Sequence, residues 1–186
     1  MVPTMTIDEL LERYTAEERD FRGIEFSIRG KIRSLENINL SGVDFRSSSL
    51  ESITFFTGVN LSKANLRRLT LERSNLEEAN FSEADLSYTD LWRSDFSHTS
   101  FRGANLSGAN LHESVMFDVD LREANLSRAY LQDTYFSSSD LRGANFSYAK
   151  GINVSDYGKK TFFDCRFNKT IMPDGRKYHD QWKYME

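Results

Sequence analysis

The residue types that most often carry catalysis or bind metals are few and widely spaced in this chain of 186 residues. Its three histidines are His98, His112 and His179, and its single cysteine is Cys165. No combination of these residues has the close spacing at which cysteines and histidines bind zinc. We therefore interpret the histidines as solvated surface residues, and we predict that the protein holds no metal and no cofactor.

Nucleophilic chemistry has no firmer basis in the sequence. Cys165 lies two residues before Phe167. In the repeat described below, the position two residues before a large apolar residue points inward and carries a small side chain. We therefore interpret Cys165 as a buried, inert thiol. Serines follow many large apolar residues, as Ser62 follows Leu61, but none has a histidine and a carboxylate at a suitable spacing. There is no glycine-rich loop of the kind that binds phosphates. We predict that the protein is not an enzyme.

These residues belong to a repeat that occupies most of the chain. From Leu61 onward, a large apolar residue recurs at every fifth position, and a smaller inward residue stands two positions before it. Asn or Asp usually lies between the two, as in Ala84-Asp85-Leu86 and Ala104-Asn105-Leu106. The 18 large residues are Leu61, Leu66, Leu71, Leu76, Phe81, Leu86, Leu91, Phe96, Phe101, Leu106, Leu111, Met116, Leu121, Leu126, Leu131, Phe136, Leu141 and Phe146.

A period of five residues fits neither a regular helix nor a regular strand. A helix turns by about 100° per residue, so this period would spread the large residues around the whole helix. A strand alternates sides at every residue, so an odd period would place successive large residues on opposite faces. A chain that turns a corner in each unit keeps them all on the inside, and its successive coils pair at about 4.8 Å. The spacing predicts a solenoid and leaves the number of its sides open.

The A(D/N)LXX pattern resembles the pentapeptide repeat family over roughly residues 20–150. The opening segment ELLERYTAEERDF also resembles the leader of many small bacterial members, especially those of photosynthetic bacteria. The resemblance implies an all-β solenoid, a right-handed quadrilateral β-helix with four pentapeptides in each coil. About 25 units then give about six to seven coils and a rod about 30 Å long at the spacing of paired strands.

We divide the chain into three parts: a leader with a capping helix (1–19), the pentapeptide-repeat β-helix (20–150), and an irregular last coil with a capping tail (151–186). In the leader, Thr6-Ile7-Asp8-Glu9 has the pattern of a capping box and predicts a short helix to about Tyr14. In the last part, we expect one more irregular coil that includes Phe163, Cys165 and Phe167, followed by a turn at Pro173-Asp174-Gly175. We expect the tail that follows to pack across the C-terminal end.

The phase of the repeat slips twice before residue 61. Nine residues separate Phe26 from Leu35, and we interpret Ile28-Arg29-Gly30 as a shortened, imperfect unit. Phe55 keeps step with the units before it, but Leu61 follows it after six residues. We therefore expect a bulge or a widened corner near Phe55 to Gly58.

Composition narrows the possible partners and the compartment. The formal net charge is −4, which argues against a protein built mainly to bind the nucleic acid backbone. The chain has no apolar run of membrane-spanning length, no secretory signal, and one cysteine, which fits a reducing compartment. We predict a cytoplasmic protein that binds neither nucleic acid nor membranes. We expect it to be a monomer or a weak end-to-end homodimer.

The outward side chains are unevenly charged. We number the faces of the coil from their first large residues, so that Leu61, Leu66, Leu71 and Leu76 begin faces one to four. Within residues 59–148, faces one and two carry seven basic and five acidic residues, whereas faces three and four carry two basic and eight acidic residues, a net charge of −6. The acidic face consists of Glu72, Glu77, Glu78, Asp90, Asp95, Glu113, Asp118 and Asp133.

Large residues also replace the usual polar ones on faces three and four. We expect these residues to lie close together and to form an exposed patch of the kind that binds partners. The alternative is that the rings stack into surface ladders that cover the backbone and bind nothing. The candidate partner-binding surface consists of Trp92, His112, Val115, Phe117, Tyr130 and Tyr135.

Two functions from different classes remain open. The first is a non-enzymatic structural or protein-interaction module that presents side chains on a rigid solenoid to an unknown protein. The second comes from the resemblance, because some pentapeptide repeat proteins mimic duplex DNA and bind the type II topoisomerase gyrase. A net charge of −6 is modest beside a duplex with one charge per about 1.7 Å. We also find no match to the C-terminal dimerisation element of those relatives.

Overall fold

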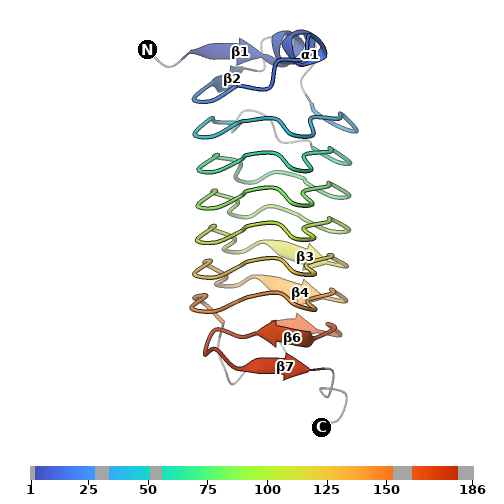
Figure 1. Ribbon diagram of the computed structural model, residues 1–186, viewed down its shortest axis with the longest axis vertical. Coiled ribbons are helices and arrows are strands. Elements are labelled where there is room, and N and C mark those ends of the chain that lie inside the picture. The colour runs from blue at the N-terminus through green and yellow to red at the C-terminus, as the bar shows by residue number, and fades with distance from the viewer. Residues whose placement is uncertain (1–2, 28–33, 51–55, 153–160, 180–186) are drawn as a thin grey trace.

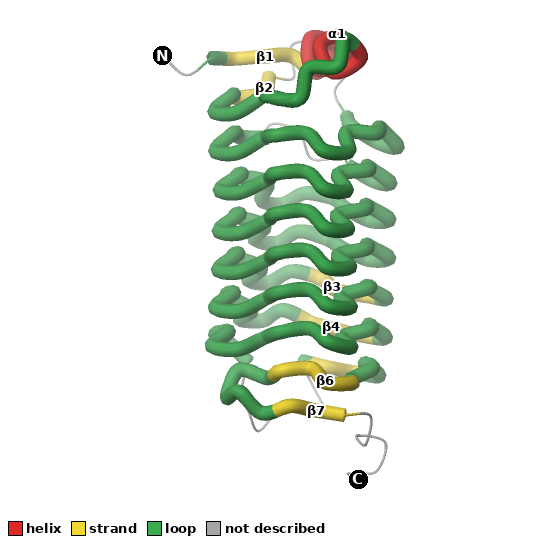
Figure 2. Tube along the Cα trace, viewed as in Figure 1, coloured by secondary structure: helices red, strands yellow, loops and turns green. Residues whose placement is uncertain are grey.

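The computed structural model describes residues 3–27, 34–50, 56–152 and 161–179, which form a rod of stacked coils (Figure 1). Most of each coil consists of turns joined by single parallel bridges, so the trace is largely loop in Figure 2. The regular elements are β1 (Thr4–Thr6), α1 (Ile7–Thr15), β2 (Glu25–Ser27), β3 (Val115–Phe117), β4 (Tyr135–Ser137), β5 (Phe162–Phe163), β6 (Asn168–Ile171) and β7 (Lys177–His179).

Each five-residue unit makes one side and one corner of a coil. In the unit that begins at Leu61, the N–H of Ala64 donates to the carbonyl of Leu61 at 3.2 Å. Lys63, just before Ala64, has a φ of 58°, the left-handed conformation found at the third position of type II turns. The corner absorbs one residue more than a flat strand would, so the next large residue, Leu66, again points inward and is buried.

Four such units complete one coil. Parallel bridges join Asn60 to Asn80 and Asn80 to Ser100, a separation of 20 residues. Between adjacent coils, Leu61 N–H donates to the Asn80 carbonyl at 2.8 Å, and Asn80 N–H donates to the Val59 carbonyl at 2.9 Å. The predicted quadrilateral β-helix is therefore confirmed.

The Asn or Asp of each unit stabilises both the corner and the stack. The Oδ1 of Asn60 accepts the N–H of Ser62 at 3.0 Å, which fixes the start of the corner. Between coils, Asn105 Nδ2 donates to Asp85 Oδ1 at 3.1 Å, and Asn125 Nδ2 donates to Asn105 Oδ1 at 3.2 Å. The repeated pattern of the sequence thus reflects a polar ladder on the outside of the rod.

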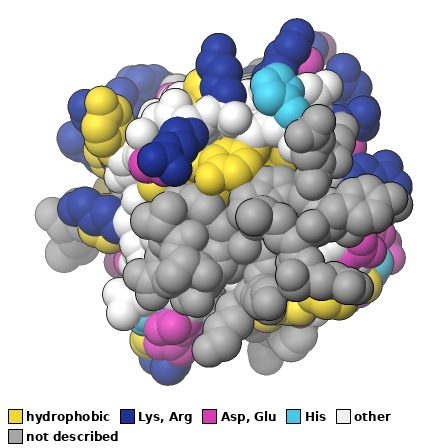
Figure 3. Space-filling model, turned by 90° about the horizontal axis from the view of Figure 1, so that it is seen from below, with side chains coloured by type: hydrophobic (Ala, Val, Ile, Leu, Met, Phe, Trp, Pro, Cys, Tyr) yellow, Lys and Arg dark blue, Asp and Glu magenta, His cyan; other side chains and the backbone are white. Residues whose placement is uncertain are grey.

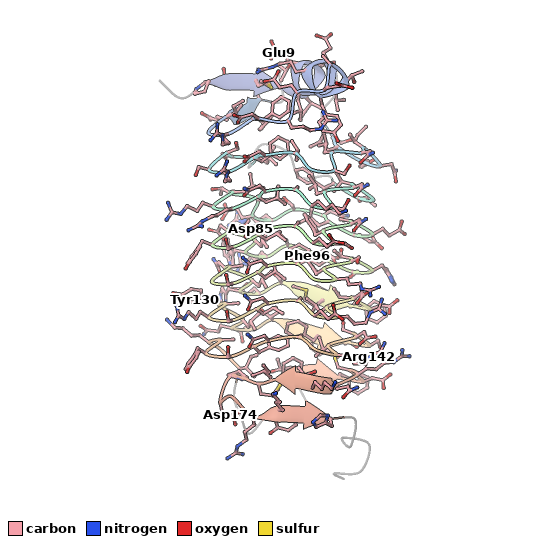
Figure 4. The ribbon with its side chains drawn as sticks, in the orientation of Figure 1. Glu9, Asp85, Phe96, Tyr130, Arg142 and Asp174 are labelled. Atoms are coloured by element: carbon pink, nitrogen blue, oxygen red, sulfur yellow. The ribbon has the colours of Figure 1, made fainter. Side chains whose placement is uncertain are left out.

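The large residues fill the interior in columns. Phe81 stacks on Phe101 with ring centroids 5.1 Å apart, and Phe96, labelled in Figure 4, packs edge-on against Phe101 at 5.2 Å. Several of the small inward positions carry Ser or Thr, whose hydroxyls bond to the previous coil. Thr99 Oγ1, for example, donates to the Leu76 carbonyl at 2.7 Å. The interior is thereby packed without an unpaired hydroxyl at this position.

The N-terminal helix predicted from its capping box is confirmed and closes that end of the core. Thr6 Oγ1 accepts the Glu9 N–H at 3.2 Å, and the Glu9 carboxylate accepts the Thr6 N–H at 2.8 Å. Ile7 and Leu10 are buried, and Tyr14 packs against the same core. Before the helix, β1 pairs in parallel with β2 and adds a further rung to the stack.

At the C-terminal end, Phe162 is buried and Phe163 is exposed. Strand β5 pairs in parallel with β4, and the register places Phe162 beside Phe136, with ring centroids 5.1 Å apart. Phe162 therefore continues the inward column, and Phe163, the next residue of the strand, points outward. The predicted turn at Pro173-Asp174-Gly175 then leads into β7, which pairs antiparallel with β6.

The phase slip before residue 61 also differs from the expected position. Phe56 is fully buried, and its N–H donates to the Asn75 carbonyl at 2.9 Å, so Phe56 is the inward residue in step with Leu61. Leu50 and Phe56 are both buried and six positions apart, so the phase slips between them and not at residues 56–58. Phe55 itself, and the imperfect unit assigned to residues 28–30, lie outside the described residues.

The close stacking of coils makes a testable difference between two glycines. Gly151 and Gly143 both have positive φ, so alanine costs about 1 kcal/mol of strain at either position. A Cβ at Gly151 would lie 2.4 Å from the amide nitrogen of Gln132, whereas one at Gly143 would come no closer than 3.4 Å to Glu123. We expect Gly151→Ala to lower the free energy of unfolding by about 1–3 kcal/mol more than Gly143→Ala. Urea denaturation followed by circular dichroism measures both, and equal losses would contradict this close approach.

Candidate functional site

Trp92 on face three is surrounded by cations of its own chain. The Cζ atoms of Arg73 and Arg93 lie 4.7 Å and 4.5 Å from its ring centroid. Cation–π contacts of this kind at exposed sites contribute about 0.5–1 kcal/mol. Arg93 also donates to the Glu113 carboxylate at 2.6 Å. Much of the indole is thus occupied by intramolecular contacts, and its side chain is only partly exposed.

The other two predicted residues of face three, His112 and Tyr130, are engaged in the same way. His112 Nδ1 lies 2.8 Å from the Gln132 carbonyl oxygen, and its Nε2 lies 3.0 Å from the Glu113 carboxylate. The Lys150 ammonium lies 4.7 Å from the centroid of the Tyr130 ring. An open cleft of about 200 Å³ beside them is smaller than typical ligand sites. Its lining residues are Asn110, His112, Tyr130, Gln132, Lys150 and Gly151.

Face four differs, because its large residues stand on paired strands. Val115 and Phe117 stand on either side of buried Met116 along β3, and Tyr135 begins β4. The parallel register pairs Val115 with Tyr135 and Phe117 with Ser137. Val115, Phe117 and Tyr135 are 41%, 43% and 44% exposed. These three side chains therefore form an exposed apolar surface on adjoining strands.

Strand β5 adds a fourth residue that sequence reasoning missed. Phe163 pairs with Ser137 and is 55% exposed, so it continues the column that begins with Phe117. Ser137, between the two phenylalanine positions, is only 6% exposed. The one signal in the sequence was the doubled phenylalanine at 162 and 163, one of which had to point outward. We refer to Val115, Phe117, Tyr135 and Phe163 as the apolar cluster.

The six predicted surface residues fall into two sets on adjacent faces. The first comprises Trp92, His112 and Tyr130, and the other three belong to the apolar cluster. His98 borders the cluster, with its ring edge-on to Phe117 at 5.4 Å and its Nδ1 3.1 Å from the Asp118 carboxylate. Among the described residues, no ring contact or hydrogen bond joins one set to the other.

Half of the acidic face is already bonded within the chain. Asp90 accepts from Asn110 Nδ2 at 2.9 Å, and Asp95 accepts from the Ser97 N–H at 2.9 Å. Glu113 bonds Arg93, which holds the pKa of this carboxyl below its usual range, and Asp118 contacts His98. Within the described ranges, the carboxylates of the other four residues have neither an ion pair nor a hydrogen bond: Glu72, Glu77, Glu78 and Asp133.

Two of the four basic residues of face one within residues 59–148 pair with neighbouring aspartates. Arg122 donates to Asp120 at 2.8 Å, and Arg142 donates to Asp140 at the same distance. Burial raises the pKa of both aspartates, but the hydrogen bonds from the arginines outweigh it and the net shift is downward. Arg142 and Tyr130 project from opposite sides of the rod (Figure 4). Seen from the C-terminal end, charged side chains of both signs surround its perimeter (Figure 3).

The remaining reactive side chains are scattered. His179 Nδ1 lies 3.1 Å from Asn168 Oδ1, far along the chain from the other histidines. In the part of the chain that the structure describes, no three His, Cys, Asp or Glu side chains gather as metal ligands do. None of the described helices has both the length and the apolar character needed to cross a bilayer.

Comparison with known proteins adds three findings. A family model described as pentapeptide repeats, in eight copies, matches residues 56–93, 79–116 and 117–150. A solved structure of trypsin-treated QnrB1, described as a plasmid-mediated fluoroquinolone resistance protein, is similar with a TM-score of 0.54. It is 18% identical, and the match covers 87% of each chain, so the likeness concerns the fold. Comparison with curated protein sequences gives no match.

Two cyanobacterial structures are also similar. HetL from Nostoc sp. strain PCC 7120, described as involved in heterocyst differentiation regulation, is 21% identical over 94% of this chain and 100% of its own, with a TM-score of 0.28. Rfr23 from Cyanothece 51142, described as a pentapeptide repeat protein, is 25% identical over 87% of this chain and 96% of its own, with a TM-score of 0.33.

Cys165 provides a test of the packing at the last coil. The side chain is half-buried, and burial raises the pKa of its thiol to about 12. Because only the thiolate is alkylated, iodoacetamide at pH 8 should modify the native protein at least about a hundredfold more slowly than the urea-unfolded chain. The native rate should rise about tenfold per pH unit below this pKa. Mass spectrometry follows both rates, and equal rates in the two states would contradict the burial.

Proposed function

This chain belongs to the pentapeptide repeat family, and from that premise we propose that it acts without catalysis, by binding a protein partner on a rigid surface. The binding surface that we propose is the apolar cluster on face four. The inward side chains fill the interior, so the outward walls are what the rod offers to other molecules. On the other walls the outward positions are mostly Ser, Asn, Asp and Arg.

The single observation that carries this proposal is the exposure of four apolar side chains on three adjoining strands. Strands β3, β4 and β5 form one parallel sheet, and each contributes at least one member of the cluster. Exposed apolar groups of this kind, especially Phe and Tyr, are typical anchors of protein interfaces. A partner that covers them would remove apolar area from water at about 25 cal/mol per Å².

The backbone beneath the cluster is held in place before any partner arrives. Asp118 N–H donates to the Ser137 carbonyl at 2.8 Å, and Ser138 N–H donates to the Phe163 carbonyl at 2.9 Å. A surface fixed in this way loses little conformational entropy when it binds. Trp92, His112 and Tyr130 already have intramolecular partners, so we expect them to contribute less than the apolar cluster.

The proposal is tested by crosslinked pull-down from native lysate with a double variant of the cluster. Phe117→Ser with Tyr135→Ser should abolish capture of the partner that the wild type retains, because two of its apolar anchors are removed. Circular dichroism and thermal melting should stay unchanged, since both side chains point away from the core. Capture that survives the double substitution would overturn the proposal.

A matched control removes two aromatic side chains from the opposite wall. Tyr88 and Tyr148 on face two are 55% and 73% exposed, so Tyr88→Ser with Tyr148→Ser removes at least as much exposed aromatic surface as the cluster variant does. We expect this variant to capture the partner as well as the wild type does. Trp92→Ser alone should also retain most of the capture, which separates the apolar cluster from the set on face three.

A second candidate function is the DNA-mimicking binding of gyrase. The net charge of −6 on faces three and four favours it. The intramolecular bonds of Asp90, Asp95, Glu113 and Asp118 weaken it, because they leave half of the acidic face to imitate a phosphate backbone. A duplex presents one charge per about 1.7 Å, far more densely than four carboxylates spread over several coils.

We therefore expect no effect of the protein on DNA supercoiling by gyrase. The assay measures supercoiled product with and without the protein at micromolar concentration, with and without a fluoroquinolone. Inhibition, or protection against the drug, that disappears when Glu77 and Glu78 are changed to Gln would support the DNA-mimicking function instead. The Phe117→Ser with Tyr135→Ser variant serves as the control, because it leaves every carboxylate in place.

A further inference from the structure

We propose that the partner of face four is a basic, amphipathic segment of another protein, with apolar side chains at one end and Lys or Arg at the other. This inference rests on the proposed function, because it names the chemistry of the partner at the same surface. It is argued from the way in which apolar and charged side chains are distributed along face four.

The C-terminal half of face four carries the apolar cluster. In register, Val115 stands beside Tyr135 and the Phe117 column continues to Phe163, so the cluster extends over three successive coils. His98 packs edge-on against Phe117 and closes the cluster on its N-terminal side. A bound segment would therefore place its apolar side chains over β3, β4 and β5.

The N-terminal half of face four is acidic. Glu77 and Asp95 occupy outward positions there, Glu78 lies at the corner, and all three precede the apolar cluster along the rod. In the described part of the chain, face four carries no Lys or Arg at all: residues 74–78, 94–98, 114–118, 134–138 and 161–164 contain none. Glu77 and Glu78 have no ion pair among the described residues and remain available to a cation.

The negative charge of face four favours some classes of partner over others. An anionic membrane surface or a nucleic acid would be repelled by the carboxylates beside the cluster. A second copy that docks with its own face four would bring the same carboxylates together, which is unfavourable. A segment with cationic side chains gains both attraction to Glu77 and Glu78 and burial of apolar area, and no other class of partner satisfies both halves of the wall.

The length of the wall sets the length of the segment. From the coil of Glu77 to the coil of Phe163 the wall spans five coils, or about 19 Å at the spacing of paired strands. That distance corresponds to about six residues of extended chain or about 13 residues of α-helix. The wall is flat, so an amphipathic helix lying along the rod or an extended segment would fit it.

The test uses a display library of random peptides of about 12 residues, panned on the immobilised full-length protein. Enriched peptides should carry a net positive charge together with clustered aliphatic or aromatic residues. Synthetic copies should bind at least about tenfold more weakly to Phe117→Ser/Phe163→Ser, which removes the apolar half. They should also bind at least about tenfold more weakly to Glu77→Lys/Glu78→Lys, which reverses the charged half.

Two controls accompany these variants. Tyr88→Ser/Tyr148→Ser should bind the peptides like the wild type, since it alters the opposite wall. Peptide binding to the wild type should weaken when the salt concentration rises above 0.1 M, where the Debye length is about 10 Å. Peptide binding to Glu77→Lys/Glu78→Lys should not weaken in the same way. Circular dichroism of each variant confirms that the coils are intact.

The outcomes separate the inference from the proposed function. Peptides that depend on Phe117 and Phe163 but carry no positive charge would overturn the basic partner and leave the binding surface standing. Peptides insensitive to both cluster substitutions, or no enrichment at all, would overturn both. Sedimentation that shows a dimer of the wild type, lost in Phe117→Ser/Phe163→Ser, would identify a second copy as the occupant and would also overturn the inference.

Discussion

The parallel backbone ladder between coils is the constraint on which the rest of the structure depends. Each coil must return its chain to the same register, because the sides of the rod both donate to and accept from the coils above and below them. That requirement fixes which residues point inward and forces a left-handed residue into most corners. The first coils show how the register between coils is maintained when a coil contains extra residues. Bridges there join residues 24 apart at Asp20 and Asp44 and 21 apart at Asn39 and Asn60, and the extra residues fall between the bridged positions.

The fold could be predicted from the sequence because each five-residue unit has the same physical needs. A large side chain must fill the core, a small one must fit beside it, and an Asn or Asp must accept the N–H of the corner, as Asn60 does. The inward residue could not be predicted where the phase breaks beside two adjacent phenylalanines. Periodicity alone cannot decide between Phe55 and Phe56, or between Phe162 and Phe163. The backbone pairing with the neighbouring coil determines which phenylalanine points inward, and the register of that pairing cannot be deduced from the sequence.

The candidate site could be predicted in part for the same reason. The five-residue period correctly assigned Val115, Phe117 and Tyr135 to outward positions, since each lies one residue from a buried member of the repeat. It could not show that Trp92 is flanked by Arg73 and Arg93, because such contacts depend on side-chain conformation. Nor could it show that Asp90 and Asp95 act as acceptors for corner and ladder donors. Counting carboxylates along a face therefore overstates the number of free acceptors that a partner meets.

The reversal of chain direction at β7 has a consequence for self-assembly. A stack of parallel rungs is a natural template for its own extension, which is the geometry by which amyloid fibrils propagate. At the β6–β7 hairpin the final strand runs against all the rungs before it, so a second molecule of the same polarity meets a strand of the wrong sense there. At the other end, α1 covers the core above the first coil. Within the described residues, neither end of the rod therefore presents the same parallel rung that repeats along its length.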